Sequence, residues 1–409
     1  MRMNLSPDRR ILLADADAFY VAVARLVDPD GAGRAPLLIV GGSVEGRGVV
    51  TSASYEARAY GVQSAMPMAR AVRLCPGATV VPVPWDACAE KGEQIRDVLL
   101  RFTPQVERAS SDEFYLDMSG TERLYHDEPL VLTARRIRDA VGGETGLGVS
   151  IGGGTTKLVA KLGAGVAKPR PGSGADGVYV VPPGGEGEFL RRFALAELPM
   201  VGPKAQERLG RAGLRTVVDV LNRSRDQLVS SLGDREGEWL YDRVRGLDPA
   251  PVESREIPQS LSRDHTFSHD LSDDEALARE LLRLADRASS DLRTGGFVAR
   301  TVTVKVRDTD FTTRQASRTL PAPVQADRVV YAVARELLAR LRDARRVPAR
   351  LLGVSLSQLF PMDAKTQLSL FESTDESGPE TERDRAIARA MDELRERFGP
   401  AALQRGRSL

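Results

Sequence analysis

The sequence predicts an α+β protein built from several domains. At 409 residues the chain is longer than one hydrophobic core usually serves. Short apolar runs alternate with amphipathic helical stretches in a βαββαβ-like order, which is typical of antiparallel sheets backed by helices. This order occurs up to residue 151 and again from 263 to about 357, and the composition changes between the two parts.

The first strand is predicted at 11–14, where a short apolar run ends in two carboxylates, Asp15 and Asp17. Residues i and i+2 of a strand share one face, and they diverge if the strand breaks there. A second acidic pair, Asp112 and Glu113, precedes another strand-like run, and adjacent acids suit a hairpin tip. If the two tips meet, they form an all-oxygen cluster that suits Mg²⁺ or Mn²⁺. Capping or solvated acids at strand ends are the alternative, and these residues alone leave it open.

The next segment combines three side chains that suit a phosphate. After Tyr20 the pattern is helical, a buried strand is predicted at 36–42, and a further strand runs into a helix carrying Thr51, Tyr55 and Arg58. Tyr55 and Arg58 are spaced i, i+3 and therefore share a helix face. A hydroxyl, a phenol and a guanidinium on one side suit a triphosphate clamp, while an amphipathic helix with a solvated arginine is the alternative.

A glycine-rich run, Gly152–Gly154, leads into a helix that reaches about Ala167. Its spacing does not match a Walker A loop. Lys168 and Pro169 end this helix, and a lysine beside the acids can reach a phosphate. Further helices are predicted at 90–102 and 128–141, strands at 113–118 and 146–151, and a loop at 169–187.

From Leu198 the pattern resembles a helix-hairpin-helix element, which binds phosphates through outward backbone amides. Helices are predicted at 205–212 and 217–222, and Met200 stands where the first turn glycine is usual. A plain helical hairpin remains the alternative.

The segment 243–262 has the composition of an inter-domain linker. Beyond it, helices are predicted at 275–293 and 325–346, and the clearest strand at 301–307. That strand has valines on one face and Thr, Lys and Arg on the other, which suits a nucleic-acid backbone but is also common in half-exposed strands. Past Gln358, the apolar island 367–371 is expected to dock in a groove, either of a partner or of this chain, and a last charged helix is expected at 386–398.

Composition limits the classes of function. The net charge is +1, so a nucleic-acid surface requires an uneven distribution of charge. Cys75 and Cys88 are too few for a zinc cluster or a disulfide framework, which predicts a cytoplasmic location. His265 and His269 are spaced i, i+4 without the glutamate of a zinc motif, so surface histidines are expected. No apolar run approaches membrane-spanning length, so no membrane partner is expected.

Together these motifs resemble those of the Y-family, lesion-bypass DNA polymerases, most closely the DNA polymerase IV (DinB) branch, over residues 9–371. The resemblance implies a right-hand polymerase core of palm, fingers and helix-hairpin-helix thumb, followed by a βαββαβ little finger domain. The implied boundaries are palm 1–20 and 85–182, fingers 21–84, thumb 183–245, linker 246–262, little finger 263–358 and a flexible tail 359–409 with a clamp-binding motif at 367–371 and a terminal helix.

The same resemblance implies a set of site residues. The catalytic metal ligands are expected to be Asp15, Asp112 and Glu113 with the backbone of Ala16, holding two Mg²⁺ ions that Mn²⁺ can replace. Asp17 matches an acid that is usually not a ligand, and Tyr20 matches the steric gate that rejects a ribose 2′-OH. The expected nucleotide-binding residues are Phe19, Tyr20, Thr51, Tyr55, Arg58 and Lys168; the DNA-binding residues Val201, Gly202, Lys204, Arg300, Thr301, Thr303, Lys305 and Arg307; and the clamp-binding residues Gln367, Leu368, Leu370 and Phe371.

The sequence departs from the family pattern at three positions. Ser111 replaces the usual apolar residue before the acid pair, and Ala24 replaces a customary glutamate. Met200 replaces the hairpin glycine, which bears on the contact between thumb and phosphate. The metal ligands are intact.

The expected function is template-dependent DNA synthesis of the lesion-bypass type, by two-metal nucleotidyl transfer from a dNTP to a primer 3′-OH. Low processivity, no proofreading, a monomer, and recruitment by the bacterial sliding clamp are also expected. Val50 and Ala53 are the candidates to lie over the nascent base pair. A non-catalytic DNA-binding scaffold and a nucleotidyl cyclase are the alternatives, which Mg²⁺-dependent extension of a primer and its need for a template distinguish.

Overall fold

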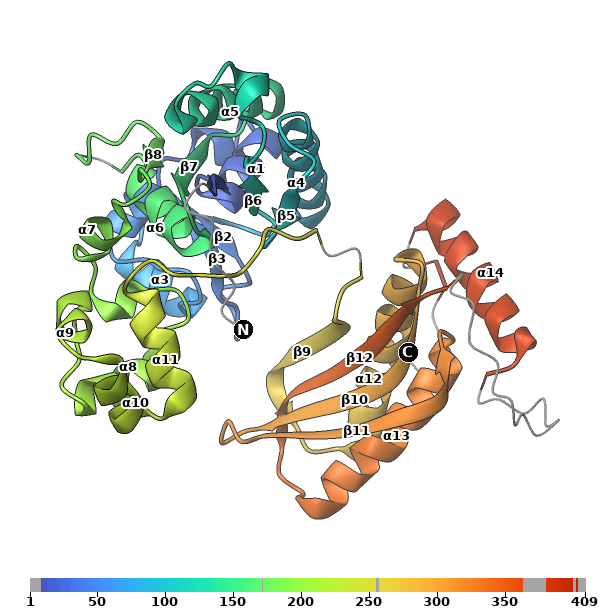
Figure 1. Cartoon of the computed structure of the whole chain (residues 1–409). Coiled ribbons are helices and arrows are strands. Elements are labelled where there is room, and N and C mark those ends of the chain that lie inside the picture. The colour runs from blue at the N-terminus through green and yellow to red at the C-terminus, as the bar shows by residue number, and fades with distance from the viewer. Residues whose placement is uncertain (1–8, 171, 255–256, 363–379, 400–401, 404–409) are drawn as a thin grey trace, which may run out of the picture. The chain divides into compact units, whose positions relative to one another are not determined.

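The computed structural model describes residues 9–170, 172–254, 257–362, 380–399 and 402–403. The chain divides into two compact units, Met1–Ser254 and Arg255–Leu409, and each contains both helices and strands (Figure 1). The division falls inside the segment 246–262, where the sequence predicts a linker.

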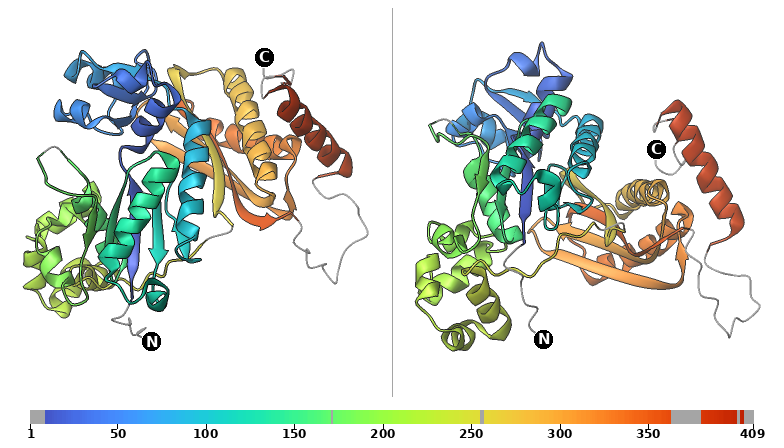
Figure 2. Two further views of the ribbon diagram at one scale, coloured as in Figure 1. Left: turned by 90° about the horizontal axis from the view of Figure 1, so that it is seen from above. Right: turned by 45° about the horizontal axis from the view of Figure 1, so that its top comes forward.

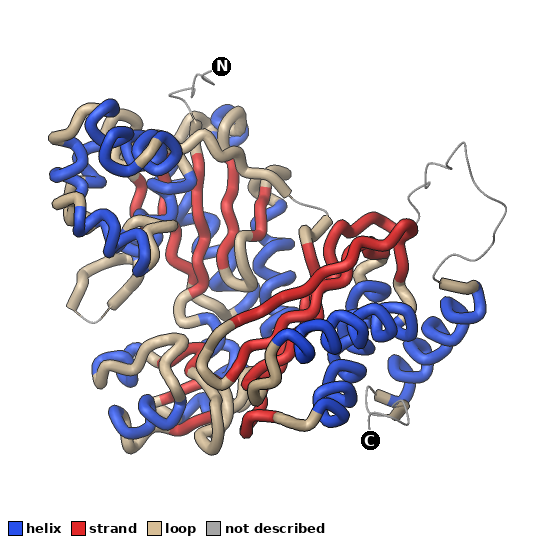
Figure 3. Tube along the Cα trace, turned by 90° about the horizontal axis from the view of Figure 1, so that it is seen from below, coloured by secondary structure: helices blue, strands red, loops and turns tan. Residues whose placement is uncertain are grey.

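A five-stranded sheet with the strand order β5-β6-β1-β7-β8 forms the centre of the first unit (Figure 3). Its strands are β1 (Ile11–Ala16), β5 (Val106–Arg108), β6 (Glu113–Asp117), β7 (Val149–Gly154) and β8 (Val178–Val180). β1 pairs antiparallel with β6 and β7 and is buried from Ile11 to Ala14, because it is the central strand. β8 joins β7 in parallel, which the expectation of an antiparallel sheet missed, because helix α6 (Lys157–Ala167) carries the chain back across the sheet.

Helices cover both faces of this sheet. Since side chains alternate along a strand, Leu12 and Ala14 pack with α1 (Phe19–Val27), α4 (Trp85–Leu100) and α5 (Leu130–Thr145). α4 and α5 lie side by side over that face (Figure 2). Ile11 and Leu13 point the other way and pack against Ala160 and Ala164 of α6. The strand therefore ends between two helical layers, and its last residues are held firmly in place.

A smaller three-stranded sheet with the order β3-β2-β4 follows in the chain. It consists of β2 (Leu38–Gly41), β3 (Val50–Ala53) and β4 (Thr79–Val81), and it packs with α2 (Tyr55–Ala59) and α3 (Met68–Leu74). Thr51 lies on β3 and not on the helix as predicted, because Ser54 caps the helix and α2 begins only at Tyr55.

Helices follow β8 and share one apolar core in the first unit. They are α7 (Glu186–Leu190), α8 (Pro203–Arg211), α9 (Val217–Leu221), α10 (Arg225–Leu232) and α11 (Asp234–Arg243). The short 3₁₀ helices η1 (Ala32–Arg34), η2 (Glu122–Tyr125) and η3 (Leu195–Glu197) also belong to this unit. Met200 has φ 76°, the left-handed conformation that glycine favours, so the turn before α8 keeps its shape with a side chain present.

The second unit has the βαββαβ order that the sequence predicts. Its elements are β9 (Ser260–Leu271), α12 (Asp274–Thr294), β10 (Phe297–Asp308), β11 (Thr313–Val324), α13 (Asp327–Ala344) and β12 (Ala349–Pro361). The antiparallel sheet has the order β11-β10-β12-β9, and α12 and α13 pack on one face of it (Figure 1). Val302, Val304 and Val306 are buried under these helices, as the alternation predicted.

The last helix, α14 (Glu382–Phe398), is tied to α12 and α13 mainly by charge pairs. Arg293 of α12 donates both to Asp392 at 2.6 Å and to the carbonyl oxygen of Gln325 at 2.7 Å. Arg395 meets Asp286 at 2.7 Å. The charged last helix is thus an integral part of the second unit, a role that the sequence did not reveal.

The glycine run of the sequence is the second half of β7, and α6 packs closely against it. A Cβ atom at Gly152 would overlap the backbone of α6 at Ala160 and Ala164.

No helix in the described residues is both long and apolar enough to span a membrane.

Gly152→Ala is expected to lower the free energy of unfolding by about 3 kcal/mol or more, because neither backbone can move aside. The matched control is Gly143→Ala in the exposed part of α5, where nothing lies near the new methyl group and helix propensity improves by up to about 1 kcal/mol. Urea denaturation measures both. Equal effects of the two substitutions would contradict the packing of α6 on β7.

Candidate active site at the end of the central strand

Three acids from two distant segments meet at the end of β1. Asp15 lies directly opposite Glu113 in the pairing of β1 with β6. The N–H of Ala16 donates to the carbonyl oxygen of Asp112 at 3.0 Å. Asp112 and Glu113 stand at the tip of the β5–β6 hairpin, as adjacent acids were expected to. The two tips therefore meet, which the residues alone left open and the family resemblance implied.

Two lysines of the α6 region face these acids. Lys168 Nζ lies 2.6 Å from Asp15 Oδ1, and Lys161 Nζ lies 2.6 Å from Glu113 Oε2. Lys168 was predicted from the sequence, whereas Lys161 was missed. The signal was available, since Lys157 and Lys161 are spaced i, i+4 and share a face of α6, and Lys157 also meets an acid, Glu107, at 2.6 Å.

The serines before the acid pair hold its geometry. Ser110 Oγ donates to Asp112 Oδ1 at 2.7 Å and accepts from the N–H of Glu113 at 3.1 Å. Ser111 Oγ lies 2.9 Å from the phenol oxygen of Tyr20 and 3.4 Å from Asp112 Oδ1. From the sequence, Ser111 stood out only as a departure from the pattern that the resemblance implies, and Ser110 was missed.

Burial raises the pKa of Asp15, and the charge of Lys168 opposes this shift while Glu113 and Asp112 add to it. In the part of the chain that the structure describes, no three acidic, histidine or cysteine side chains converge enough to hold a metal ion as they stand. The carboxylates turn to the lysines instead. Their all-oxygen donor set and mutual repulsion nevertheless fit a hard divalent cation, which would take the place of the ammonium groups as the counter-charge.

Asp17 diverges from Asp15 and has a different partner. Its Oδ1 accepts from Ser150 Oγ at 2.7 Å, and its N–H donates to the carbonyl oxygen of Gly148 at 2.9 Å. Burial raises the pKa of Asp17, although the hydrogen bond from Ser150 and the charge of Lys168 lower it in part. Asp17 therefore belongs to the wall of the site and not to the acid cluster.

Three of the predicted triphosphate residues come from the small sheet and the helix that follows it, Thr51 from β3 and Tyr55 and Arg58 from α2. The Arg58 guanidinium lies 5.4 Å above the ring of Tyr55, and its Nε donates to the carbonyl oxygen of Ala53 at 2.9 Å. The phenol oxygen of Tyr55 is buried without a hydrogen-bond partner, and burial raises its pKa. The charges of Asp17 and Lys168 both act on this phenol, so Tyr55 stands near the acid end of the site. An unpaired buried hydroxyl there suits an incoming polar ligand.

A cavity of about 460 Å³ adjoins the acids. Asp15, Lys161, Lys168 and Arg170 line it, together with Ser173, Phe193, Glu197 and Pro199. The three cationic side chains outnumber the two carboxylates of the lining, Asp15 and Glu197, which suits a polyanion that brings a cation with it. Arg170 is a further lining residue that the sequence analysis did not single out.

The aromatic residues after β1 have different surroundings. Phe19 is 2% exposed and belongs to the core beneath the sheet, so its side chain is not open to a nucleotide. The ring of Tyr20 lies edge-on between Phe19, at 5.3 Å between centroids, and Trp85, at 6.0 Å. Tyr20 is half-buried and Trp85 is exposed.

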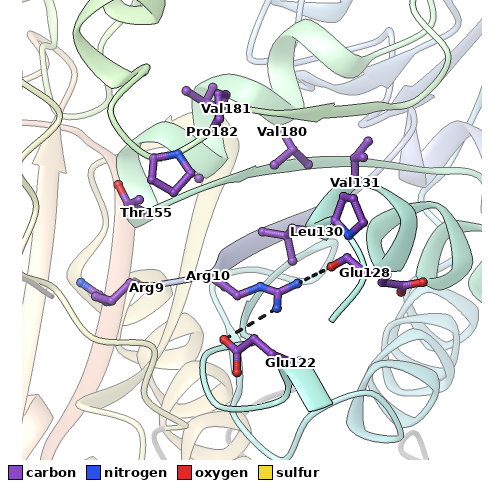
Figure 4. A pocket seen from close by; sticks show the side chains of 13 residues that line it. Arg9, Arg10, Glu122, Glu128, Leu130, Val131, Thr155, Val180, Val181 and Pro182 are labelled. Carbon is purple, nitrogen blue, oxygen red and sulfur yellow. Dashed lines mark hydrogen bonds and ion pairs between the residues drawn. The ribbon is translucent and has the colours of Figure 1, made fainter. Parts of the chain in front are cut away.

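A second cavity, of about 690 Å³, lies at the other end of β1 from the acids. It is lined mostly by apolar residues of β8 and of the start of α5, and Arg10 donates to the carbonyl oxygen of Glu128 and meets Glu122 (Figure 4). It contains neither the acids nor the lysines of the site. Its volume alone does not make it the reactive centre.

The predicted DNA-binding residues of the first unit surround the start of α8. Val201 is buried in the helical core, Gly202 precedes the helix, and Lys204 is exposed in its first turn. Met200, beside them, is 83% exposed. The side chain of Val201 is thus unavailable to a ligand. Its backbone and the first turn of α8 remain as the groups that could contact DNA.

The predicted DNA-binding residues of the second unit lie on β10. Thr301 hydrogen-bonds with Thr319 and Thr303 with Ser317, each at 2.9 Å. Lys305 pairs with Asp264, Arg307 donates to Thr313 at 2.9 Å, and Arg300 donates to the carbonyl oxygen of Leu320 at 3.2 Å beside an irregularity in the strand pairing. Neighbouring strands thus hold these side chains. The predicted clamp-binding residues, Gln367, Leu368, Leu370 and Phe371, lie outside the described residues.

Comparison with known proteins gives a consistent match over most of the chain. The model of the impB/mucB/samB family matches residues 14–165, the model of that family's C-terminal domain matches residues 258–370, and a model described as DNA polymerase-iota, thumb domain, matches residues 196–248. The DNA polymerase IV of Halorhodospira halophila is 38% identical over 88% of this chain and 98% of its own length. The DNA polymerase IV of Caulobacter vibrioides is 35% identical over 97% of this chain and 93% of its own.

Solved structures agree on the fold. A Y-family DNA polymerase chimera of Dbh and Dpo4 superimposes with a TM-score of 0.75 at 24% identity, covering 86% of this chain and 99% of its own. An insertion ternary complex of Dbh DNA polymerase gives a TM-score of 0.60 at 24% identity, over 85% and 98% of the two chains.

Asp17→Asn is expected to raise the free energy of unfolding at pH 7 by about 1 kcal/mol, since asparagine still accepts from Ser150 without a buried charge. A carboxyl group whose pKa is raised by folding makes the protein less stable as the pH rises from the pKa of the unfolded state to that of the folded state. The variant lacks this group, so its free energy of unfolding should decline less above about pH 4. Urea denaturation across this pH range measures it.

The control is Asp28→Asn. Backbone N–H groups of Ala32 and Gly31 lower the pKa of Asp28, so its contribution is present above its unfolded pKa and lost as the pH falls. This variant should therefore be less stable at pH 7. Changes of the same sign in both variants would contradict the assignment for Asp17.

Proposed function

Because the chain belongs to the Y family of DNA polymerases, in its DNA polymerase IV branch, we propose that Asp15, Asp112 and Glu113 serve metal-dependent transfer of a nucleotide from a dNTP to a primer 3′-OH. The resemblance seen in the sequence is confirmed, and the protein is a DNA-directed DNA polymerase of the lesion-bypass type. The observation that carries the proposal is the meeting of the β1 end with the β5–β6 hairpin tip. Family membership sets the nucleotidyl cyclase aside, and the presence of all three acids argues against a non-catalytic scaffold.

Asp15, Asp112, Glu113 and the carbonyl oxygen of Ala16 would hold the metal, with two Mg²⁺ ions proposed and Mn²⁺ as a substitute. When bound, the metal makes the primer hydroxyl more acidic and neutralises phosphate charge. Asp15 must be ionised for this, and the charge of Lys168 opposes the rise in the pKa of Asp15 that burial causes. Ser110 keeps Asp112 in place through its short hydrogen bond.

Lys168, Arg58, Tyr55 and Thr51 are proposed to align the triphosphate for in-line attack. Lys168 adjoins the acids and lines the cationic cavity, which supports its role. The unpaired phenol of Tyr55 offers a donor to a phosphate oxygen. Fixed donors of this kind stabilise the charge that develops in phosphoryl transfer without reorganising.

The domain assignment is proposed on the same basis. The five-stranded sheet and its helices correspond to the palm (1–20 and 85–182), the three-stranded sheet to the fingers (21–84), the helices α7 to α11 to the thumb (183–245), and the βαββαβ unit to the little finger (263–358). The linker (246–262) contains the division between the two units.

Primer–template DNA and dNTP are the proposed ligands. Backbone amides before and within α8 and the polar face of β10 are proposed to contact DNA. Low processivity without proofreading, a monomeric state, a cytoplasmic location and recruitment by a sliding clamp through 367–371 stay predictions.

Asp112→Ala or Glu113→Ala is expected to lower primer extension by a factor of about 10³ or more while DNA binding persists, because each removes a ligand for the metal. Extension of a labelled primer, with and without template and with EDTA, measures this. The control is Asp117→Ala at the far end of β6, which should retain activity. Extension retained by Glu113→Ala would overturn the metal assignment.

Tyr20→Ala is expected to lower discrimination against ribonucleotides on the order of 100-fold, because the ring that would meet the 2′-OH is gone. The ratio of kcat/KM for a ribonucleotide to that for the matching deoxyribonucleotide measures it. An unchanged ratio would show that Tyr20 is not the steric gate.

A further inference from the structure

The phenol of Tyr20 is anchored by a side chain from a distant part of the chain. Its oxygen lies 2.9 Å from Ser111 Oγ, although the two residues are 91 positions apart. Ser111 stands at the hairpin tip, directly before the acid pair. The hairpin that carries Asp112 and Glu113 therefore also reaches the residue proposed as the gate.

The other contacts of Tyr20 are apolar, since its ring packs against two clusters of buried residues. Phe19 and Trp85 both meet it edge-on, with interplanar angles of 75°. Trp85 is 64% exposed, so the wall that it provides is open to solvent. Within the described residues, the hydrogen bond with Ser111 is the polar contact that fixes the phenol end of the ring.

A steric gate rejects a substrate only if it cannot move aside. If the side chain rotates away when a 2′-OH arrives, the steric clash is relieved at a small cost in strain. The selectivity against ribonucleotides therefore depends on how firmly the side chain is held. A hydroxyl that holds the far end of the ring is well placed to supply this anchoring, because it opposes rotation about the bond next to the backbone.

We propose that Ser111 is a positioning residue for sugar selection, whose hydroxyl holds Tyr20 in the conformation that excludes ribonucleoside triphosphates and admits 2′-deoxy substrates. The inference rests on the proposed role of Tyr20 as the gate. The apolar residue that is usual at this position in the family could not form this hydrogen bond. The bond therefore depends on the serine that this chain has there.

The neighbouring residue Ser110 supports the acid cluster, so positioning Tyr20 and supporting the acids can be tested separately. It lies next to Ser111 and bonds to Asp112 at 2.7 Å, whereas Ser111 is 3.4 Å from the same oxygen. The main task of holding Asp112 thus falls to Ser110, and the closer partner of Ser111 is Tyr20. Ser110→Ala is a matched control on the same hairpin.

The test measures kcat/KM for CTP and for dCTP opposite a template guanine in the full-length chain. Ser111→Ala should raise the CTP to dCTP ratio about three- to tenfold, which the loss of one ordinary hydrogen bond gives. Tyr20→Phe should raise it equally, because it removes the same bond from the other side. Ser111→Thr should restore the ratio, and Ser110→Ala should slow both substrates without changing it.

The double variant Ser111→Ala, Tyr20→Phe decides between a shared bond and two separate effects. If the bond is shared, the double variant should match either single variant. An unchanged ratio in Ser111→Ala and Tyr20→Phe, or additive changes in the double variant, would overturn the proposal. If Tyr20→Ala relaxes selection in the same assay, the gate stands and only the anchor fails; if it does not, the gate itself fails.

Discussion

The site depends on how the chain offsets the negative charge that it gathers at the end of β1. Asp15 is buried beside Asp112 and Glu113, and this raises its pKa. Burying carboxylates is costly unless cations compensate, and here Lys168 and Lys161 each bring an ammonium group to 2.6 Å. In the proposed reaction a divalent cation held by the acids would supply the counter-charge in their place, and Lys168 would then be available to a phosphate. The same lysine would thus compensate the acids in the free protein and contact the substrate.

The close packing of α6 on β7 places these lysines. Gly152 and Gly163 let the two backbones approach, since a Cβ at either position would press on the backbone of the other element. Lys161 lies on this helix and Lys168 directly follows it. The distance between α6 and β7 therefore determines how far the two lysine side chains reach toward β1. A glycine-rich segment that has no phosphate-loop function therefore still matters for phosphate chemistry, through helix position.

The fold class could be predicted because it follows from local patterns, whereas the meeting of the acids was left open by the residues themselves and was implied by the family resemblance. The apolar run before Asp15 and the acid pair before the next strand can be read within ten residues. Several other contacts between distant segments were not predicted. The parallel β8, the glycine contact at Gly152 and the reach of Lys161 depend on how α6 lies, and the bond between Ser111 and Tyr20 depends on where a hairpin tip comes to rest.

The attachment of α14 has a practical consequence for where the protein can be shortened. The family models end at residue 370, before this helix begins. Yet Glu380 accepts from the backbone N–H groups of Gln325 and Ala326 at the start of α13, and Asp392 covers an Arg293 side chain that is only 6% exposed. A recombinant fragment that ends at residue 370 would expose the surface of α12 and α13 that α14 covers. An isolated second unit should therefore end after Phe398.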